Sequence, residues 1–195
     1  MLEDLELLDL WTIIRMRPGM YIGGTGPGGL HYIAYELIHL GLDEFRAGAC
    51  KNIAVTVHRD GSLSVEDNGR SSSLQEARTL LTDYRRICEL PEDISISSRK
   101  FFNTLFHGRL VLVVPAALSA WLTCEIRDGE RCWQTSCEAP RDKRPDYWED
   151  IGACLPGETG ISFHFLPDPT VFGDTTWDSS ILLGWLWEQV HLYPG

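Results

Sequence analysis

The spacing of apolar positions along the chain predicts three amphipathic helices and one more polar helix. In residues 30–47 the apolar side chains recur three and four residues apart, as one face of a long helix requires. Gly48 follows this run and is a plausible C-terminal stop for the helix. The other predicted helices cover residues 5–14, 177–191 and, with a polar composition, 74–90.

Other segments alternate apolar and polar residues with a period of two, which predicts strands. Residues 53–57 and 62–65 are separated by Asp60-Gly61, and the pair reads as a β-hairpin. The same pattern gives two further strands around Asp128-Gly129 and a late one; they cover residues 120–127, 130–136 and 160–166. A mixture of helices and hairpins without repeats or a linker predicts one α+β domain over residues 1–195.

Three stretches read as irregular. Residues 23–29 are rich in glycine and predict a loop before the long helix, and residues 91–99 are also loop-like. Residues 138–150 are rich in Pro, Asp, Arg and Lys, so we expect an exposed excursion there.

Composition narrows the functions that are open to this chain. A net charge of −11 disfavours direct DNA binding, because nucleic-acid surfaces cluster Lys and Arg. The sequence has no apolar run of membrane-spanning length and its start does not resemble a signal peptide, so we expect a cytoplasmic protein without membrane contact. The six cysteines contain no Cys-x-x-Cys pair, which argues for reduced thiols and against a metal site.

Two motifs carry a specific resemblance. Residues 17–23 read Arg-Pro-Gly-Met-Tyr-Ile-Gly, and the predicted hairpin is followed by Asp67-Asn68-Gly69-Arg70. Together with Gly157-Glu158-Thr159-Gly160 they resemble the N-terminal ATPase domain of the gyrase B and topoisomerase IV B family, within the GHKL (Bergerat-fold) superfamily. The resemblance implies a two-layer sandwich, in which helices cover one face of a mixed, mostly antiparallel sheet.

The resemblance also assigns residues to an adenine side and a catalytic side. It matches Glu36 to the general base that activates water, and His31 to a histidine in the same segment. It matches Asp67 to the carboxylate that reads the adenine amino group. Arg70 matches the arginine beside the adenine pocket, whose usual salt-bridge partner corresponds to Glu44. The adenine side of the family's site is therefore present in this sequence.

The phosphate side departs from the family pattern. Leu40 stands where the family has its magnesium-binding Asn, and an aliphatic side chain offers no oxygen ligand. His39, at the position of a family Asp, does not replace that ligand. The glycine-rich lid is reduced to a segment ending in Gly108-Arg109-Leu110. Because an interior proline removes a helix hydrogen bond, we expect residues 109–114 to be extended and a helix to start near Pro115.

Further substitutions make the predicted cleft more apolar. Ile161 replaces a threonine near the adenine, Trp133 replaces an arginine at the pocket edge, Leu110 adds another aliphatic wall, and Ser71 replaces a glycine. Apolar walls with a few polar groups are typical of small-molecule pockets. We therefore expect an apolar organic ligand, no cofactor, and neither ATPase nor topoisomerase activity. If a reaction occurs, metal-independent acid–base chemistry at Glu36 is expected, such as isomerisation, cyclisation or elimination.

Three alternatives remain open from the sequence. The cleft is a decayed site that has collapsed into the core, or the domain is a pseudo-ATPase that acts through protein contacts, on gyrase itself for example, or it still binds adenine nucleotides weakly. The predicted last helix contains Trp185 and Trp187 among leucines where the family carries Lys and Arg, which favours a homodimer through this helix. The resemblance also places the chain's end where the family continues into a transducer domain.

Overall fold

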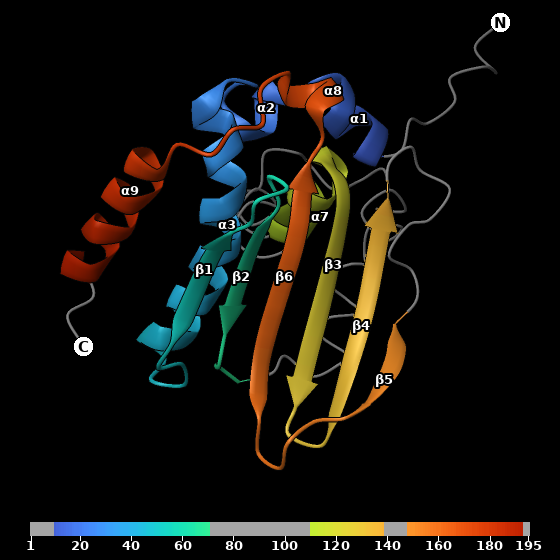
Figure 1. Cartoon of the computed structure of the whole chain (residues 1–195), viewed down its shortest axis with the longest axis vertical. Helices are drawn as coiled ribbons and strands as arrows, with labels where there is room; N and C mark the ends of the chain where they lie inside the picture. Colours follow the sequence, from blue (N-terminus) through green and yellow to red (C-terminus); the bar gives the residue numbers. More distant parts are fainter. Residues whose placement is uncertain (1–9, 71–109, 139–147, 193–195) are drawn as a thin grey trace, which may run out of the picture.

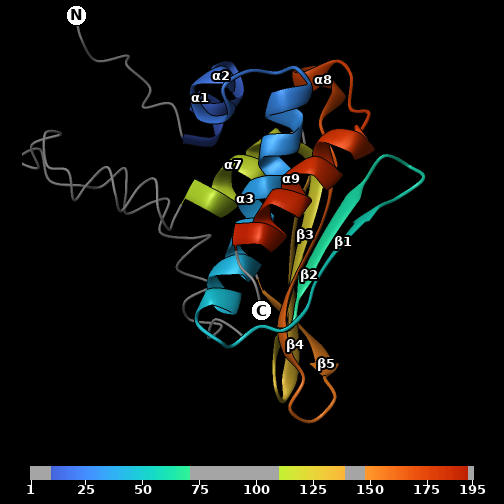
Figure 2. The ribbon, with the colours of Figure 1, turned by 90° about the vertical axis from the view of Figure 1, so that its left-hand side faces the viewer.

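The computed structural model describes residues 10–70, 110–138 and 148–192, and these form a six-stranded sheet with helices on one face (Figures 1 and 2). The strand order is β1-β2-β6-β3-β4-β5, and every neighbouring pair is antiparallel. The strands are β1 Ile53–Val57, β2 Leu63–Asp67, β3 Ser119–Asp128, β4 Arg131–Glu138, β5 Glu149–Ala153 and β6 Thr159–Pro167. The expected α+β sandwich is confirmed, and its described sheet is antiparallel throughout.

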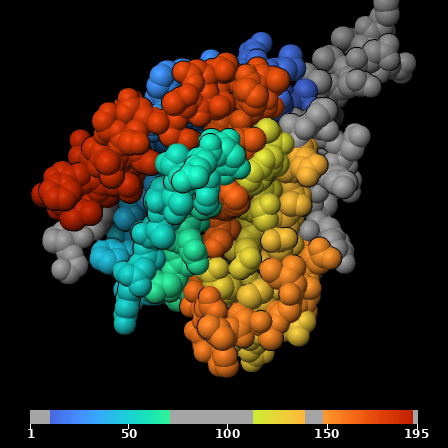
Figure 3. Space-filling view, viewed as in Figure 1, coloured from blue at the N-terminus to red at the C-terminus, as the bar shows by residue number. Residues whose placement is uncertain are grey.

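The helices are of unequal length, and the longest crosses the sheet. They are α1 Leu10–Met16, α2 Gly19–Ile22, α3 Pro27–Arg46, α7 Leu110–Leu118, α8 Pro169–Phe172 and α9 Ser179–Leu192. Figure 2 shows α3 and α7 against one side of the sheet, with α9 beside α3, and Figure 3 shows the strands forming the opposite surface. No helix in the described parts of the chain is long and apolar enough to cross a membrane.

The core lies between α3 and the sheet because both present periodic apolar faces to it. Ile33 and Leu37 of α3 are almost fully buried, as are Leu63, Phe163 and Phe165 on the strands beneath. Side chains on a strand alternate between its two faces, so the intervening residues of β2 and β6 lie on the other side of the sheet. This arrangement confirms the helical and strand periodicities of these segments.

Two predicted hairpin turns are present and depend on glycine. Gly61 and Gly129 adopt φ of +87° and +94°, a region that other residues rarely occupy. Gly48, the predicted stop of the long helix, has φ of +71° just after α3. These three positions follow from local chemistry, which is why the sequence located them.

The long helix begins earlier than expected. Instead of a loop through residue 29, α3 starts at Pro27, whose fixed φ suits the first helical turn. A Cβ at Gly29 would lie 1.8 Å from the carbonyl oxygen of Gly24, so the glycine lets the preceding loop close against the helix. The glycines of this segment therefore serve packing as well as a turn.

The prediction for residues 109–115 is wrong. Residues 110–114 are helical, and Pro115 lies inside α7 rather than at its start. A mid-helix proline forfeits one backbone hydrogen bond. Pro115 is fully buried, and Val114, Ala117 and Leu118 beside it are buried as well. Packing of this apolar helix against α1 and α3 outweighs the local cost.

The predicted excursion over residues 138–150 is also wrong at its end. Trp148 is only 4% exposed, and β5 begins at Glu149 as an edge strand that pairs with β4. Its sequence, Glu-Asp-Ile-Gly-Ala, lacks an alternating apolar pattern, because the backbone of β4 holds it in place. The predicted helix over residues 74–90 and the loop over residues 91–99 lie outside the described residues.

Candidate functional site

Three of the predicted ligand residues lie on one row across the sheet. Ile126 of β3 pairs with Ile161 of β6 on one side and with Trp133 of β4 on the other. On β2, Glu66 pairs with Ser162, which places Asp67 beside Ile161. We call Asp67, Ile161, Ile126 and Trp133 the Asp67 row. Their side chains lie on the face that the helices cover, because Asp67 and Ile126 are buried there.

Asp67 is a buried carboxylate with two backbone donors. Its side chain accepts a hydrogen bond from the Gly69 N–H at 2.8 Å and another from the Ile161 N–H. Burial raises the pKa of Asp67 above its ordinary value, and the nearby Glu44 charge adds to this, although the backbone donors act in the opposite direction. A carboxyl group in such surroundings is suited to accept a hydrogen bond from a ligand.

Glycines allow the backbone to close around Asp67. A Cβ at Gly160 would lie 2.0 Å from the Asp67 carbonyl oxygen, and Gly160 has φ of +139°. A Cβ at Gly69 would meet the Glu44 side chain at 2.9 Å, and one at Gly41 would approach the Asp67 Cβ at 3.2 Å. Substituting any of these glycines would displace Asp67 or the α3 turn above it.

Arg70 and Arg127 hold the loop and strand around Asp67 from two sides. The Arg70 guanidinium binds the Glu44 carboxylate through Nε–Oε2 and Nη2–Oε1 contacts of 3.0 and 3.3 Å. This is the ion pair that the resemblance implies. Arg127, which sequence reasoning missed, is 7% exposed and donates to the Asp67 carbonyl oxygen at 3.2 Å. An arginine in an otherwise apolar strand was the available signal.

Glu36 lies on a different face of α3, together with Leu40. It is half-buried, and the phenol of Tyr32, one turn earlier, donates a hydrogen bond to its carboxylate. Burial and this contact raise the pKa of Tyr32 to about 12. Leu40, one turn later, is partly buried and packs against the core. The sequence did not single out Tyr32, whose role depends on the i, i+4 geometry of the helix.

His31 does not share the face of Glu36. It is fully buried, its Nδ1 lies 2.7 Å from the Pro27 carbonyl oxygen, and its Nε2 accepts a hydrogen bond from the Asp178 N–H at 3.1 Å. Five residues separate His31 from Glu36, which turns the two side chains about 140° apart around the helix. This geometry gives His31 a structural role between α3 and the start of α9, and it does not support the predicted catalytic role.

His39 is exposed and directed toward the last helix. Its ring meets Trp185 of α9 edge to face, with centroids 5.2 Å apart. Trp133 is half-buried, and its Nε1 donates to the Asp128 carboxylate at the β3–β4 turn, at 3.0 Å. The side chain of Leu110, Ser71 and the lid segment lie outside the described residues. Among the described residues, no group of three His, Cys, Asp or Glu side chains is arranged to hold a metal ion.

Comparison with known proteins points to one family, although no protein-family model matches the chain. The chain is 37% identical to DNA gyrase B of Thermotoga maritima, over 99% of its own length and 30% of the relative's. It is 33% identical to the B protein of DNA topoisomerase 4 from Bacillus subtilis, over 99% of the chain and 29% of that protein.

A solved structure agrees with these relatives. The 43K ATPase domain of Thermus thermophilus gyrase B, crystallised in complex with an aminocoumarin, matches 95% of this chain and 46% of the crystallised chain, with a TM-score of 0.75 and 29% identity. The chain spans about 30% of the length of the curated relatives that it matches. Both the whole-chain identity and the shared architecture show that this chain belongs to the gyrase B-like GHKL family of ATPase domains.

Proposed function

We propose that the Asp67 row binds an organic molecule other than a magnesium nucleotide and that this domain does not hydrolyse ATP. The Asp67 row carries this proposal, because one buried carboxylate is followed by two isoleucines and the tryptophan Trp133. Apolar walls with a single hydrogen-bonding group are the usual composition of a small-molecule site. The ligand would donate an N–H or O–H to Asp67 and lay an apolar body over Ile161 and Ile126.

The residues beside Glu36 fit a magnesium nucleotide poorly. Mg²⁺ takes hard oxygen ligands and commonly bridges phosphate oxygens. Glu36 supplies a carboxylate, but Leu40 on the next turn is aliphatic and packs against the core. An ion placed there would lose one protein ligand and face a methyl-lined surface. The charge of a triphosphate would then lack this compensation.

A relative supports the idea that this fold accepts a non-nucleotide molecule. The gyrase B domain of Thermus thermophilus was crystallised in complex with an aminocoumarin. An aminocoumarin is therefore a suitable probe for the present chain. If the natural ligand is transformed, Glu36 is the group placed to accept or return a proton, and Tyr32 orients its carboxylate.

Isothermal titration calorimetry with an aminocoumarin, adenosine, ADP and ATP, each with and without Mg²⁺, tests this proposal. We expect aminocoumarin binding that Asp67→Asn weakens at least tenfold, and no tightening of ADP or ATP by Mg²⁺. Ile161→Thr restores the family's hydroxyl and serves as the matched variant on the same row. Mg²⁺-dependent ATP binding with turnover would overturn the proposal, and adenosine binding alone would support a weak adenine binder instead.

A protein-interaction role is the second candidate, and the surface of α9 favours it. Leu183, Trp187 and Val190 are each more than 60% exposed and recur at three- and four-residue spacing. Exposed apolar stripes of this kind commonly mark contact surfaces. We propose a second copy of this chain as the partner.

A further inference from the structure

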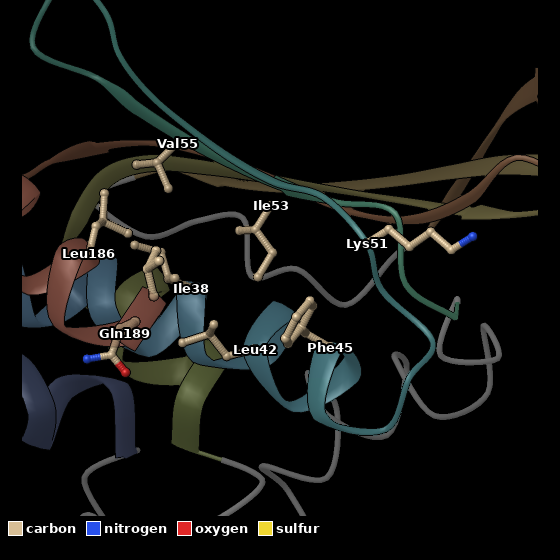
Figure 4. Close-up of a pocket in the computed structure, with 9 residues that line it drawn as sticks. Ile38, Leu42, Phe45, Lys51, Ile53, Val55, Leu186 and Gln189 are labelled. Atoms are coloured by element: carbon tan, nitrogen blue, oxygen red, sulfur yellow. The ribbon is translucent and has the colours of Figure 1, made fainter. Parts of the chain in front are cut away.

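A second apolar cavity lies beneath α9, on a different face of α3 from Glu36. Figure 4 shows Ile38, Leu42 and Phe45 of α3 facing Ile53 and Val55 of β1. Leu186 and Val190 of α9, together with Gln189, complete the wall. The cavity has a volume of about 300 Å³, at the lower end of the range for ligand sites.

This cavity and the Asp67 row do not share a residue. Ile38 and Leu42 lie four residues apart on one side of α3, whereas Glu36 and Leu40 lie four residues apart on another. The cavity is bounded by the edge strand β1, which lies outside β2 and its Asp67. A molecule bound here would therefore not enter the site proposed above.

The shape and chemistry of the cavity fit one alkyl chain. Its walls are branched aliphatic side chains and a single ring, and they offer few hydrogen-bonding groups. Ile38 and Phe45 are seven residues apart on α3, which places them roughly 10 Å apart along the helix axis. A volume of about 300 Å³ would hold one medium-length chain but not a two-chain lipid.

The two ends of the cavity differ in charge. Figure 4 shows Gln189 near Leu186 at one end, and Lys51 beyond Phe45 at the other, with its amino group directed outward. Lys51 is exposed, and among the described residues none forms an ion pair with it. An acid group leaving the cavity at this end would meet a cation.

We propose that this cavity binds a medium-chain aliphatic carboxylate, with its alkyl tail between α3, β1 and α9 and its head group at Lys51. The inference stands independently of the function proposed for the Asp67 row. Burial of each further methylene should tighten binding about fourfold until the cavity is full. The pairing of the carboxylate with an exposed lysine should add a smaller, salt-dependent increment.

Calorimetric titration of the whole chain with hexanoate, octanoate, decanoate and dodecanoate tests the proposal below their micelle concentrations. We expect affinity to rise steeply with chain length and then level off. Lys51→Gln should weaken octanoate severalfold and leave 1-octanol unchanged. Arg59→Gln removes a similar exposed charge from the β1–β2 turn, outside the cavity wall, and should change neither ligand.

Filling the cavity provides a variant that does not depend on charge. Val55→Phe adds a ring from a half-buried position on the edge strand and should abolish binding of both acid and alcohol. Urea unfolding of the same sample shows whether the variant is folded, and Leu186→Phe fills the cavity from α9 if it is not. Absence of carboxylate binding by the folded wild type would overturn the proposal. So would chain-length-independent affinity, or binding that survives both filling variants.

Discussion

The phenol of Tyr32 donates a hydrogen bond to the carboxylate of Glu36, one turn apart on the exposed side of α3. This contact keeps Tyr32 protonated to about pH 12, because ionising the phenol would place a second negative charge beside Glu36 and burial already disfavours it. The folded pKa of Tyr32 is raised, so its contribution to stability is complete below pH 10 and is lost as the pH rises toward 12.

The first prediction follows from this pair. Glu36→Gln should lower the pKa of Tyr32 but leave it above the ordinary value of 10, since burial remains. Tyrosinate absorbance during an alkaline titration measures this, with Tyr32→Phe identifying the signal. A Tyr32 transition near pH 10 in the wild type would show that the contact is absent in solution.

The second prediction concerns the buried Asp67. Its raised pKa means that the ionised carboxyl destabilises the folded state, so wild-type stability should fall as the pH rises from 3.8 through the folded pKa. Asp67→Asn removes this titration. Its stability relative to the wild type should therefore increase between pH 4 and pH 7, as measured by urea unfolding. A pH-independent difference between the two proteins would contradict the assignment.

The third prediction tests the ion pair that joins the two ends of the domain. The Arg15 guanidinium lies 2.5 Å from the Asp168 carboxylate, whose side chain is 6% exposed. Burial alone would raise the pKa of Asp168, but hydrogen bonds from Thr170 and Arg15 outweigh it and lower the pKa. Removing one partner of a largely buried pair leaves the other charge unpaired, so Arg15→Met should cost about 2–3 kcal/mol.

A control and a pH profile sharpen this third prediction. Arg46→Met removes an exposed pair with Asp43 and should cost at most about 0.5 kcal/mol. Because the folded pKa of Asp168 is depressed, the contribution of Arg15 should be present above pH 3.8 and disappear as the pH falls below it. Equal losses in the two variants at pH 7 would refute the structural role of Arg15.

The fourth prediction concerns the aliphatic residue beside Glu36. Leu40→Asn supplies a side-chain oxygen, so Mg²⁺ should increase its affinity for ADP, whereas it should not do so in the wild type. The change also exposes packed core surface and should lower stability by about 1–2 kcal/mol. Leu40→Ala, with the same loss of packing but no oxygen, should remain insensitive to Mg²⁺ in calorimetry.

The fifth prediction tests self-association through α9. Trp187→Glu and Leu183→Glu each place a charge on the exposed apolar stripe and should shift the protein to a lower mass in sedimentation equilibrium. Glu188→Gln changes a polar neighbour on the same helix and should leave the mass unchanged. A wild type that is monomeric at high concentration would remove the homodimer proposal while leaving the α3–β1–α9 cavity untouched.

Local features of the chain carried most of the fold. The i, i+4 pattern of residues 30–47, the alternation in β1 and β2, and the glycine turns at Gly61 and Gly129 each appear as predicted. These features follow from helix and strand periodicity and from the backbone freedom of glycine. The sequence motifs also identified the family, and with it the positions of Asp67 and Glu36.

Tertiary packing decided what the local pattern does not contain. Burial keeps Pro115 inside a helix, and pairing with β4 makes a strand of residues that do not alternate. The register of four strands aligns Asp67 with Ile161, Ile126 and Trp133, which lie far apart in the sequence. Docking of α9 turns His31 and His39 away from Glu36 and closes the second cavity, because these contacts depend on how distant segments pack rather than on their own sequence.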